Sequence, residues 1–251
     1  MRCCWPSTNK PMKILGTRID PTSYAAATEQ ILAWARAGES RVVCAANVHT
    51  VMEAHDAPSF QKLLNDADLN TPDGMPLVWA LRALGVKGQT RVYGPDLTLA
   101  VCAAADVPVG FYGGTPAVLE KLLANFRQQF PKLQIVYASA PPFQAVMPAE
   151  DVAAIAASGA RILFVGLGCP KQERWMMEHR GRIPAVMLGV GAAFDFHAGN
   201  VRQAPRWMMR AGLEWLFRLL MEPRRLWRRY FKHNPRFVGR FLWQLLRNRH
   251  E

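Results

Sequence analysis

Several features that mark other protein classes are missing from this 251-residue sequence. The cysteines show neither metal-ligand spacing nor a disulfide pattern, which indicates reduced thiols in a cytoplasmic protein. No window offers about 18 uninterrupted apolar residues, which argues against a membrane-spanning helix. The opening MRCCWPSTNKPM lacks the apolar stretch of a signal peptide. The five cysteines are Cys3, Cys4, Cys44, Cys102 and Cys169.

Motifs for common cofactors are also absent. There is no Walker loop, and the six histidines form no pair at helical ligand spacing. The segment 163-LFVGLGCPKQE-173 lacks the third glycine, near Lys171, of a dinucleotide-binding turn. Asp66 and Asp68 form an Asp-x-Asp string, but they fall at a helix end and a strand entry without converging oxygen ligands. We therefore expect neither a metal nor a cofactor.

Acidic residues are scarce at one end of the chain. Of the net charge of +12, residues 200–251 carry +10, from 13 Lys and Arg against three Glu. Residues 1–199 carry only +2. This shift divides the chain into an N-terminal extension (1–11) expected to be poorly ordered, a core (12–199) and a basic, aromatic-rich appendage (200–251).

Short apolar runs alternate with helical patterns through the core, which predicts an α/β fold. Such alternation favours a Rossmann-like, largely parallel sheet with helices on both faces. We expect strands at 41–48, 68–71, 90–94, 108–113, 133–138, 161–168 and 185–190. Helices are expected at 22–37 with Thr22 as N-cap, and at 74–84, 95–105, 115–130, 148–158 and 170–180. In the appendage, residues 206–223 and 224–250 read as helices, with breaks near Pro223 and Pro235.

Polar side chains follow several of these strands. Asn47 ends one strand, Asp73 follows the next in a Pro-Asp-Gly turn, and Arg91 and Asp96 flank Tyr93. Ligands of parallel sheets bind beyond the carboxyl ends of the strands. The four polar residues therefore form a candidate pocket, although a turn or cap role is the simpler alternative for each alone.

Two glycine turns occupy the same topological position. Gly166 and Gly168 precede a helix, and exposed N–H groups in such a turn suit a phosphate, with a plain strand-to-helix turn as the equal alternative. Gln172, just beyond the turn, suits a sugar or uracil edge. The turn 110-GFYGGTP-116, with Gly113 and Gly114, either faces the same cleft or serves as a tight connection.

These segments resemble the WecG/TagA/CpsF family of glycosyltransferases over about residues 14–232. The resemblance rests on 47-NVHTVMEA-54, 72-PDGMPLV-78, 91-RVYGPDL-97 and 166-GLGCPKQE-173, and most heavily on residues 189–230. Within the family, exopolysaccharide β-1,4-glucosyltransferases of the GumM type are the most similar. Many members carry Thr-Pro-Asn where this chain has 45-AAN-47, so Ala45 cannot reproduce a threonine contact.

The resemblance implies an inverting, metal-independent transfer from a UDP-sugar to a polyprenyl-diphosphate-linked saccharide at the cytoplasmic membrane face. It implies that Asp73 is the base, and that the appendage 200–251 helps to close the active site and contacts the membrane. The substrate-binding residues that it implies, together with those of the two turns, are Asn47, Thr50, Arg91, Asp96, Gly113, Gly114, Gly166, Gly168, Lys171, Gln172 and Glu173. A non-catalytic sugar-nucleotide-binding subunit is the alternative, and a homo-oligomer is compatible with either.

The basic appendage has three interpretations. It is a solvated face, a nucleic-acid surface or a membrane surface. The mixture of Trp, Tyr, Phe and Arg favours a membrane surface. No nucleic-acid-binding motif is present in the sequence. We expect a peripheral protein on anionic lipid. The arginines expected to contact lipid diphosphate or membrane are Arg206, Arg218, Arg224, Arg225, Arg228 and Arg229.

Overall fold

Six strands form one parallel sheet in the computed structural model, which describes residues 10–142 and 149–247. Their order is β4-β3-β8-β7-β5-β6, and every neighbouring pair is parallel. The prediction of a Rossmann-like parallel α/β fold is confirmed. The strands are β3 (Arg41–Ala46), β4 (Leu69–Pro72), β5 (Val109–Gly113), β6 (Ile135–Ser139), β7 (Ile162–Gly166) and β8 (Val186–Gly189).

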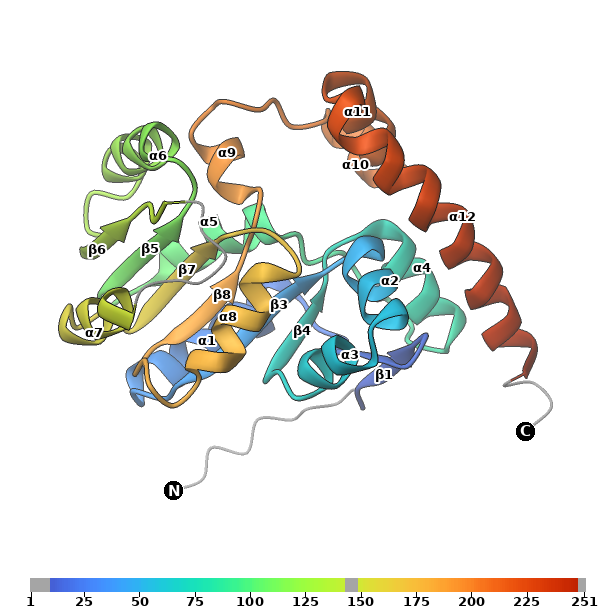
Figure 1. Ribbon diagram of the computed structural model, residues 1–251, viewed down its shortest axis with the longest axis horizontal. Helices are drawn as coiled ribbons and strands as arrows, with labels where there is room; N and C mark the ends of the chain where they lie inside the picture. The colour runs from blue at the N-terminus through green and yellow to red at the C-terminus, as the bar shows by residue number, and fades with distance from the viewer. Residues whose placement is uncertain (1–9, 143–148, 248–251) are drawn as a thin grey trace.

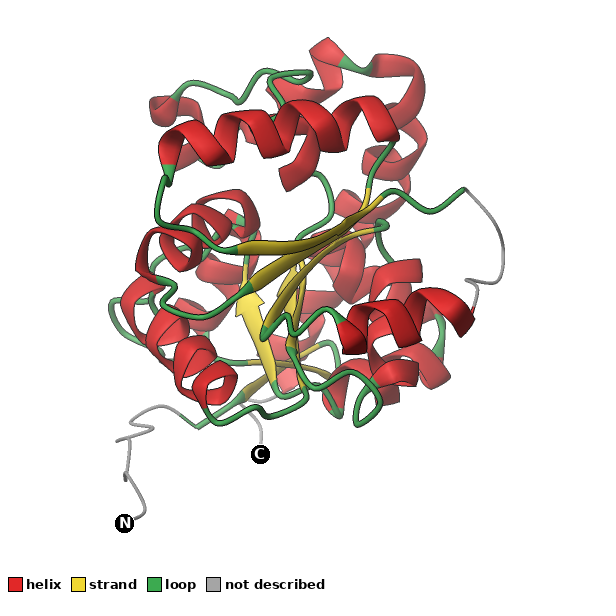
Figure 2. Cartoon of the chain, turned by 90° about the vertical axis from the view of Figure 1, so that its left-hand side faces the viewer, coloured by secondary structure: helices red, strands yellow, loops and turns green. Residues whose placement is uncertain are grey.

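Both faces of this sheet are covered because its strands are apolar on both sides. In β7, Ile162 and Phe164 enter one hydrophobic cluster, and Leu163 and Val165 enter another on the opposite face. The first cluster packs under α1 (Tyr24–Arg36), α5 (Gly94–Ala104), α6 (Pro116–Gln129) and α9 (Ala193–His197). The second packs under α2 (Val48–Asp56), α3 (Pro58–Asn65), α7 (Ala149–Ala157) and α8 (Lys171–His179). Figure 2 shows the helices on either side of the central sheet.

A third cluster joins the end of the chain to its beginning. It combines the hairpin of β1 (Met12–Ile14) and β2 (Thr17–Ile19), helices α2 and α4 (Met75–Ala83), and Phe237 and Phe241 of α12 (Pro223–Arg247). The two preceding helices are α10 (Arg206–Arg210) and α11 (Glu214–Met221). Gln244 fixes α12 to the hairpin, since its Oε1 accepts from Leu15 N at 2.8 Å and its Nε2 donates to Lys13 O at 2.9 Å. Figure 1 shows α12 lying beside α2 and α4.

Residues 90–94 do not form the predicted strand. They run irregularly until α5 begins at Gly94. Val92 N donates to Pro72 O at 3.0 Å, but Pro72 has no N–H to continue a ladder. The β-branched and aromatic residues of this stretch therefore suggested a strand that the neighbouring proline prevents.

Several predicted helix boundaries also differ. Ser23, not Thr22, caps α1, because its side chain accepts from Ala26 N. Helix α12 continues through Pro235, and the predicted helix 206–223 is divided at Gly212, whose φ is +73°. Helix α2 begins at Val48, inside the stretch assigned to a strand.

No helix of the described ranges combines the length and the apolar character needed to cross a bilayer. Most of the predicted extension 1–11, including Cys3 and Cys4, lies outside the described residues. The three described cysteines, Cys44, Cys102 and Cys169, carry free thiols, as predicted.

Candidate active site

Asp73 lies where two neighbouring parallel strands end. Strand β3 pairs Ala46 with Pro72 of β4, and Asp73 N donates to Ala46 O at 2.8 Å, which extends the pairing by one residue. Asn47 follows β3 directly, and a Cβ added at Gly74 would lie 3.6 Å from the Asn47 Cβ. The turn therefore places Asp73 beside Asn47 on the carboxyl rim of the sheet, as the sequence predicts.

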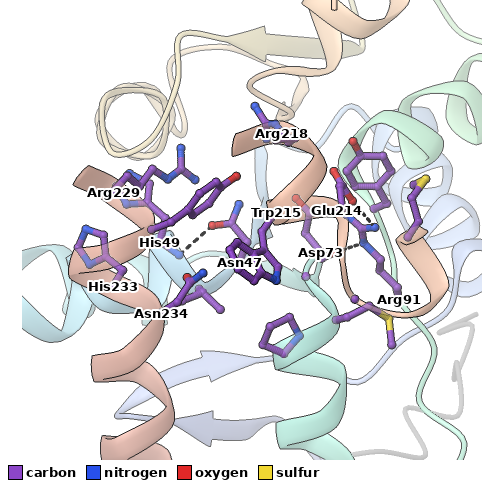
Figure 3. Close-up of a pocket in the computed structure, with 18 residues that line it drawn as sticks. Asn47, His49, Asp73, Arg91, Glu214, Trp215, Arg218, Arg229, His233 and Asn234 are labelled. Carbon is purple, nitrogen blue, oxygen red and sulfur yellow. Dashed lines mark hydrogen bonds and ion pairs between the residues drawn. The ribbon is translucent and has the colours of Figure 1, made fainter. Parts of the chain in front are cut away.

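Arg91 connects Asp73 to the C-terminal appendage. Its Nη2 lies 3.4 Å from Asp73 Oδ1, its Nε donates to the Asp73 carbonyl, and its Nη1 lies 2.6 Å from Glu214 Oε2. The guanidinium also stacks over Tyr93, with Cζ 3.9 Å from the ring centroid. Figure 3 shows Asp73 and Glu214 converging on Arg91. One cation thus joins the carboxyl rim of the sheet to the first residue of α11.

The Asp73 carboxyl is a stronger base than an ordinary aspartate. Burial raises its pKa to about 6; the Arg91 charge opposes this rise, and the Glu214 charge adds to it. The side chain nevertheless keeps 14% of its exposure, so it can be reached from the pocket. At neutral pH it is mostly ionised and able to accept a proton.

These residues line a pocket that is closed over by the appendage. The core supplies Asn47, His49, Asp73 and Arg91, and the appendage supplies residues of α10, α11 and α12. The pocket volume is about 120 Å³, below the roughly 300–1,000 Å³ typical of small-molecule sites. The appendage residues are Met209, Gly212, Glu214, Trp215, Arg218, Arg229, Tyr230, His233 and Asn234.

Two of the six predicted appendage arginines line this pocket. Arg218 and Arg229 do so, and the Nε atom of each is buried without a hydrogen-bond partner among the residues that the structure describes. Buried guanidinium donors without partners suit an anionic ligand such as a diphosphate. The other four lie outside the pocket: Arg206 borders a neighbouring hollow with Asp96, Arg225 pairs with Glu222 at 2.6 Å, and Arg224 and Arg228 are exposed.

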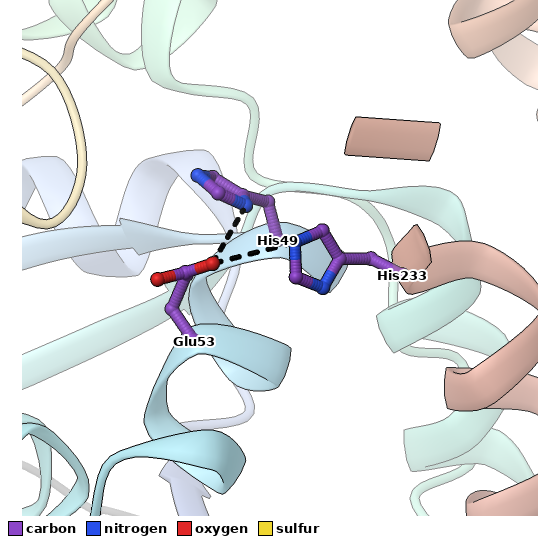
Figure 4. Close-up of side chains that lie close together, drawn as sticks. All are labelled: His49, Glu53 and His233. Atoms are coloured by element: carbon purple, nitrogen blue, oxygen red, sulfur yellow. Dashed lines mark ion pairs between the residues drawn. The ribbon is translucent and has the colours of Figure 1, made fainter. Parts of the chain in front are cut away.

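Two histidines and a glutamate join α2 to α12 at the edge of the pocket (Figure 4). His233 Nε2 lies 3.3 Å and His49 Nδ1 3.9 Å from Glu53 Oε1. Burial lowers the pKa of His49 to about 3, with a further contribution from Arg229, and burial also lowers that of His233. Their ligand atoms lie within 4.8 Å of one another, a spacing that a divalent cation could use. The positive charges of Arg229 and Lys232 nearby oppose such an ion.

The two glycine turns lie beyond the pocket, at the ends of β5 and β7. Gly113 and Gly166 approach so closely that a Cβ on Gly113 would lie 2.6 Å from the Gly166 carbonyl atoms. A Cβ on Gly166 would lie 2.8 Å from Phe194 Cδ2, and one on Gly114 would lie 3.4 Å from it. Close packing accounts for Gly113 and Gly166, and a positive φ of +72° accounts for Gly114, in each case without a ligand.

The second turn uses its polar groups internally. Gly168 N donates to Gln172 Oε1 at 3.2 Å, and Gln172 Nε2 donates to Glu173 Oε1 at 2.9 Å, with both side chains buried. Lys171 begins α8 beside them. The His49 ring forms a hydrogen bond to the Cys169 backbone, which places this turn next to the pocket without lining it. Of the predicted binding residues, the structure gathers only Asn47 and Arg91 around Asp73.

Thr50 and Asp96 also form hydrogen bonds with other protein groups. The Thr50 N–H and hydroxyl donate to Asn47 Oδ1 at 3.3 and 3.5 Å, so Thr50 supports the cap of α2. Asp96 Oδ2 accepts from the Tyr24 hydroxyl at 3.4 Å in the first turn of α5. Asp66 ends α3, and Asp68 Oδ1 lies 2.7 Å from Arg41 Nη1, so neither requires a metal.

Comparison with known proteins agrees with this architecture. The model of the glycosyl transferase WecG/TagA/CpsF family matches residues 12–251. The chain belongs to the WecG/TagA/CpsF family of glycosyltransferases. It is also similar to an N-acetylglucosaminyldiphosphoundecaprenol N-acetyl-beta-D-mannosaminyltransferase of Bacillus spizizenii, with 35% identity over 200 residues, 78% of this chain and 76% of the relative.

Sequence reasoning missed several residues that line the pocket of this glycosyltransferase. Glu214, Trp215, Tyr230 and His233 belong to the appendage, which the resemblance implied would help to close the active site but in which only arginines were predicted to bind. One signal could have identified Glu214: it is among only three acidic residues in a segment of charge +10. Such an isolated carboxylate in a basic segment needs a specific cationic partner, and Arg91 is that partner.

Proposed function

We propose that this glycosyltransferase is an inverting, metal-independent enzyme that moves a sugar from a UDP-sugar to a polyprenyl-diphosphate-linked saccharide, with Asp73 as the general base. The observation that carries the proposal is a buried carboxylate of raised pKa in one pocket with two arginines, Arg218 and Arg229. The name of the Bacillus relative, which specifies a diphosphoundecaprenol-linked N-acetylglucosamine acceptor, supports the acceptor class.

The reaction needs one proton acceptor and one stabiliser of negative charge. The acceptor hydroxyl oxygen bonds to the anomeric carbon while the bond from that carbon to the β-phosphate oxygen of UDP breaks. The hydroxyl proton passes to Asp73, which must lie within hydrogen-bond reach of it. UDP leaves with the electron pair, and fixed guanidinium groups can stabilise its charge in place of a metal ion.

Asp73→Asn tests the base directly. The amide cannot accept the proton, so turnover should fall by on the order of 10²-fold or more while UDP-sugar binding persists. Asp106→Asn, at an exposed ion pair with Arg36, is the matched control and should behave as wild type. Radiolabelled transfer from a panel of UDP-sugars to a short-chain lipid-diphosphate saccharide provides the readout. Near-normal turnover of Asp73→Asn would exclude Asp73 as base, and loss of wild-type activity in EDTA that Mn²⁺ restores would contradict metal independence.

A further inference from the structure

A second hollow lies between α4 and α12. Trp79 and Ala83 of α4 form one wall, and Phe231, Val238 and Leu242 of α12 form the other. Its volume is about 700 Å³, within the roughly 300–1,000 Å³ range of small-molecule sites. We call it the α4–α12 groove. Its walls are hydrocarbon or aromatic except at the end nearest the pocket.

The groove opens into the catalytic pocket. Gly212, Trp215, Tyr230 and Asn234 line both hollows. Gly212 at this junction has a positive φ of +73°, which favours glycine. It also packs directly on the Trp79 ring, since a Cβ at this position would lie 2.4 Å from Trp79 Cη2. Trp79 is thereby held against the turn that separates α10 from α11.

The walls of the groove leave large apolar side chains in contact with water. Phe231 is 71% exposed, Leu242 54% and Trp79 48%. Contiguous exposed apolar surface of this kind marks a binding site in a soluble domain. Covering such a surface with hydrocarbon lowers the free energy, because apolar area is removed from water.

The two hollows together fit one kind of molecule. The pocket holds the partnerless Nε atoms of Arg218 and Arg229 and suits an anion, whereas the adjoining groove suits hydrocarbon. We propose that the α4–α12 groove binds the first isoprene units of the acceptor's polyprenyl chain, with the acceptor's diphosphate at the junction where the groove opens into the pocket. This assignment rests on the proposed function for the identity of the acceptor. It makes the groove the element that selects a lipid-linked saccharide over a free one.

Direct binding tests the groove without requiring transfer. Farnesyl diphosphate and inorganic diphosphate are titrated against the full chain, with tryptophan fluorescence and calorimetry as readouts. Farnesyl diphosphate should bind at least tenfold more tightly, because only it covers the groove. Leu242→Glu should reduce that ratio about tenfold. Leu246→Glu, on the same helix, 58% exposed and outside the groove, is the matched control and should keep the wild-type ratio.

Three results would overturn the groove assignment. Equal affinity of wild type for the two ligands is the first. The second is an equal reduction of the affinity ratio in Leu242→Glu and Leu246→Glu, since it would indicate general contact with lipid. The third is a dimer in sedimentation that Leu242→Glu dissociates without any change in ligand preference. The two proposals can fail separately. If the protein prefers farnesyl diphosphate but transfers sugar from no UDP-sugar to any lipid acceptor, the proposed function is wrong while the assignment of the groove to a prenyl chain stands.

Discussion

Arg91 sets the electrostatics of the active site by sharing its charge between two carboxylates. Asp73 and Glu214 face the same guanidinium, so neither receives the full stabilisation of an isolated ion pair. Burial raises the Asp73 pKa on folding from 3.8 to about 6, and the shared Arg91 charge only partly offsets this rise. Its contribution to the free energy of unfolding is therefore present below pH 3.8 and lost as the pH rises through about 6. Burial of this carboxyl therefore lowers stability at neutral pH, the cost expected for the base proposed above.

Glu214→Gln tests this arrangement. Removing the Glu214 charge should lower the Asp73 pKa, because that charge raises it. A base must be ionised to work, so kcat/KM should fall as the pH drops through the Asp73 pKa. We expect the acid limb of wild type near pH 6 and that of the variant about half a unit to one unit lower.

The pH profile of kcat/KM is the measurement. Glu222→Gln is the control, since Glu222 pairs with Arg218 and Arg225 and does not line the pocket. A limb that stays in place in Glu214→Gln would show that the appendage carboxylate does not act on the base.

Asn47 both caps helix α2 and borders the candidate active site. Asn47 Oδ1 accepts from His49 N at 3.0 Å and from Thr50 N at 3.3 Å, which caps the helix, while the side chain also borders the pocket. An aspartate would cap equally well but would lack the amide donor that a substrate can use.

Asn47 variants separate these two roles. Asn47→Ala should cost about 1 kcal/mol of unfolding free energy together with activity. Asn47→Asp should unfold as wild type but lose about tenfold or more in kcat/KM. Ser23→Ala, which removes the cap of α1 away from the pocket, should cost similar stability with no loss of turnover. Denaturant unfolding and steady-state kinetics provide the readouts; full activity in Asn47→Asp would limit Asn47 to a capping role.

The sequence predicted elements with strong local patterns and missed those that depend on distant partners. Asp73 and Asn47 could be placed because each directly follows an apolar run, and strand ends of a parallel sheet meet at one rim. Residues 90–94 were assigned to a strand because side-chain preference says nothing of the N–H that Pro72 lacks. The contact between Arg91 and Glu214 could not be predicted from the sequence, because only the packing of α11 against the core brings these residues together.

Most of the net positive charge and most of the exposed aromatic residues described lie on the C-terminal segment, residues 200–247. Helix α12 buries Phe237 and Phe241 against the core and leaves Phe231 and Trp243 exposed. We propose that this segment holds the enzyme on the cytoplasmic face of an anionic membrane, because exposed apolar side chains and arginines together suit the bilayer interface.

Liposome flotation tests the membrane proposal. Wild type should float with anionic vesicles and much less with neutral ones, and high salt should weaken binding. Replacing Arg224 and Arg228 by glutamate should lower the vesicle affinity by at least tenfold, since each basic residue near the surface contributes about 1 kcal/mol. The control replaces Arg127 and Lys132, both exposed on the core. Equal flotation of the two double variants, or tight binding to RNA instead of lipid, would contradict a membrane role.

The small pocket beneath the appendage has a kinetic consequence. A space of about 120 Å³ is smaller than a nucleotide sugar needs, whereas Phe237, Phe241 and Gln244 hold the end of α12 on the core. We infer that α10 and α11 move aside to admit the donor while the end of α12 stays in place. The rate of this local movement then sets an upper limit on turnover, whatever the rate of the chemical step.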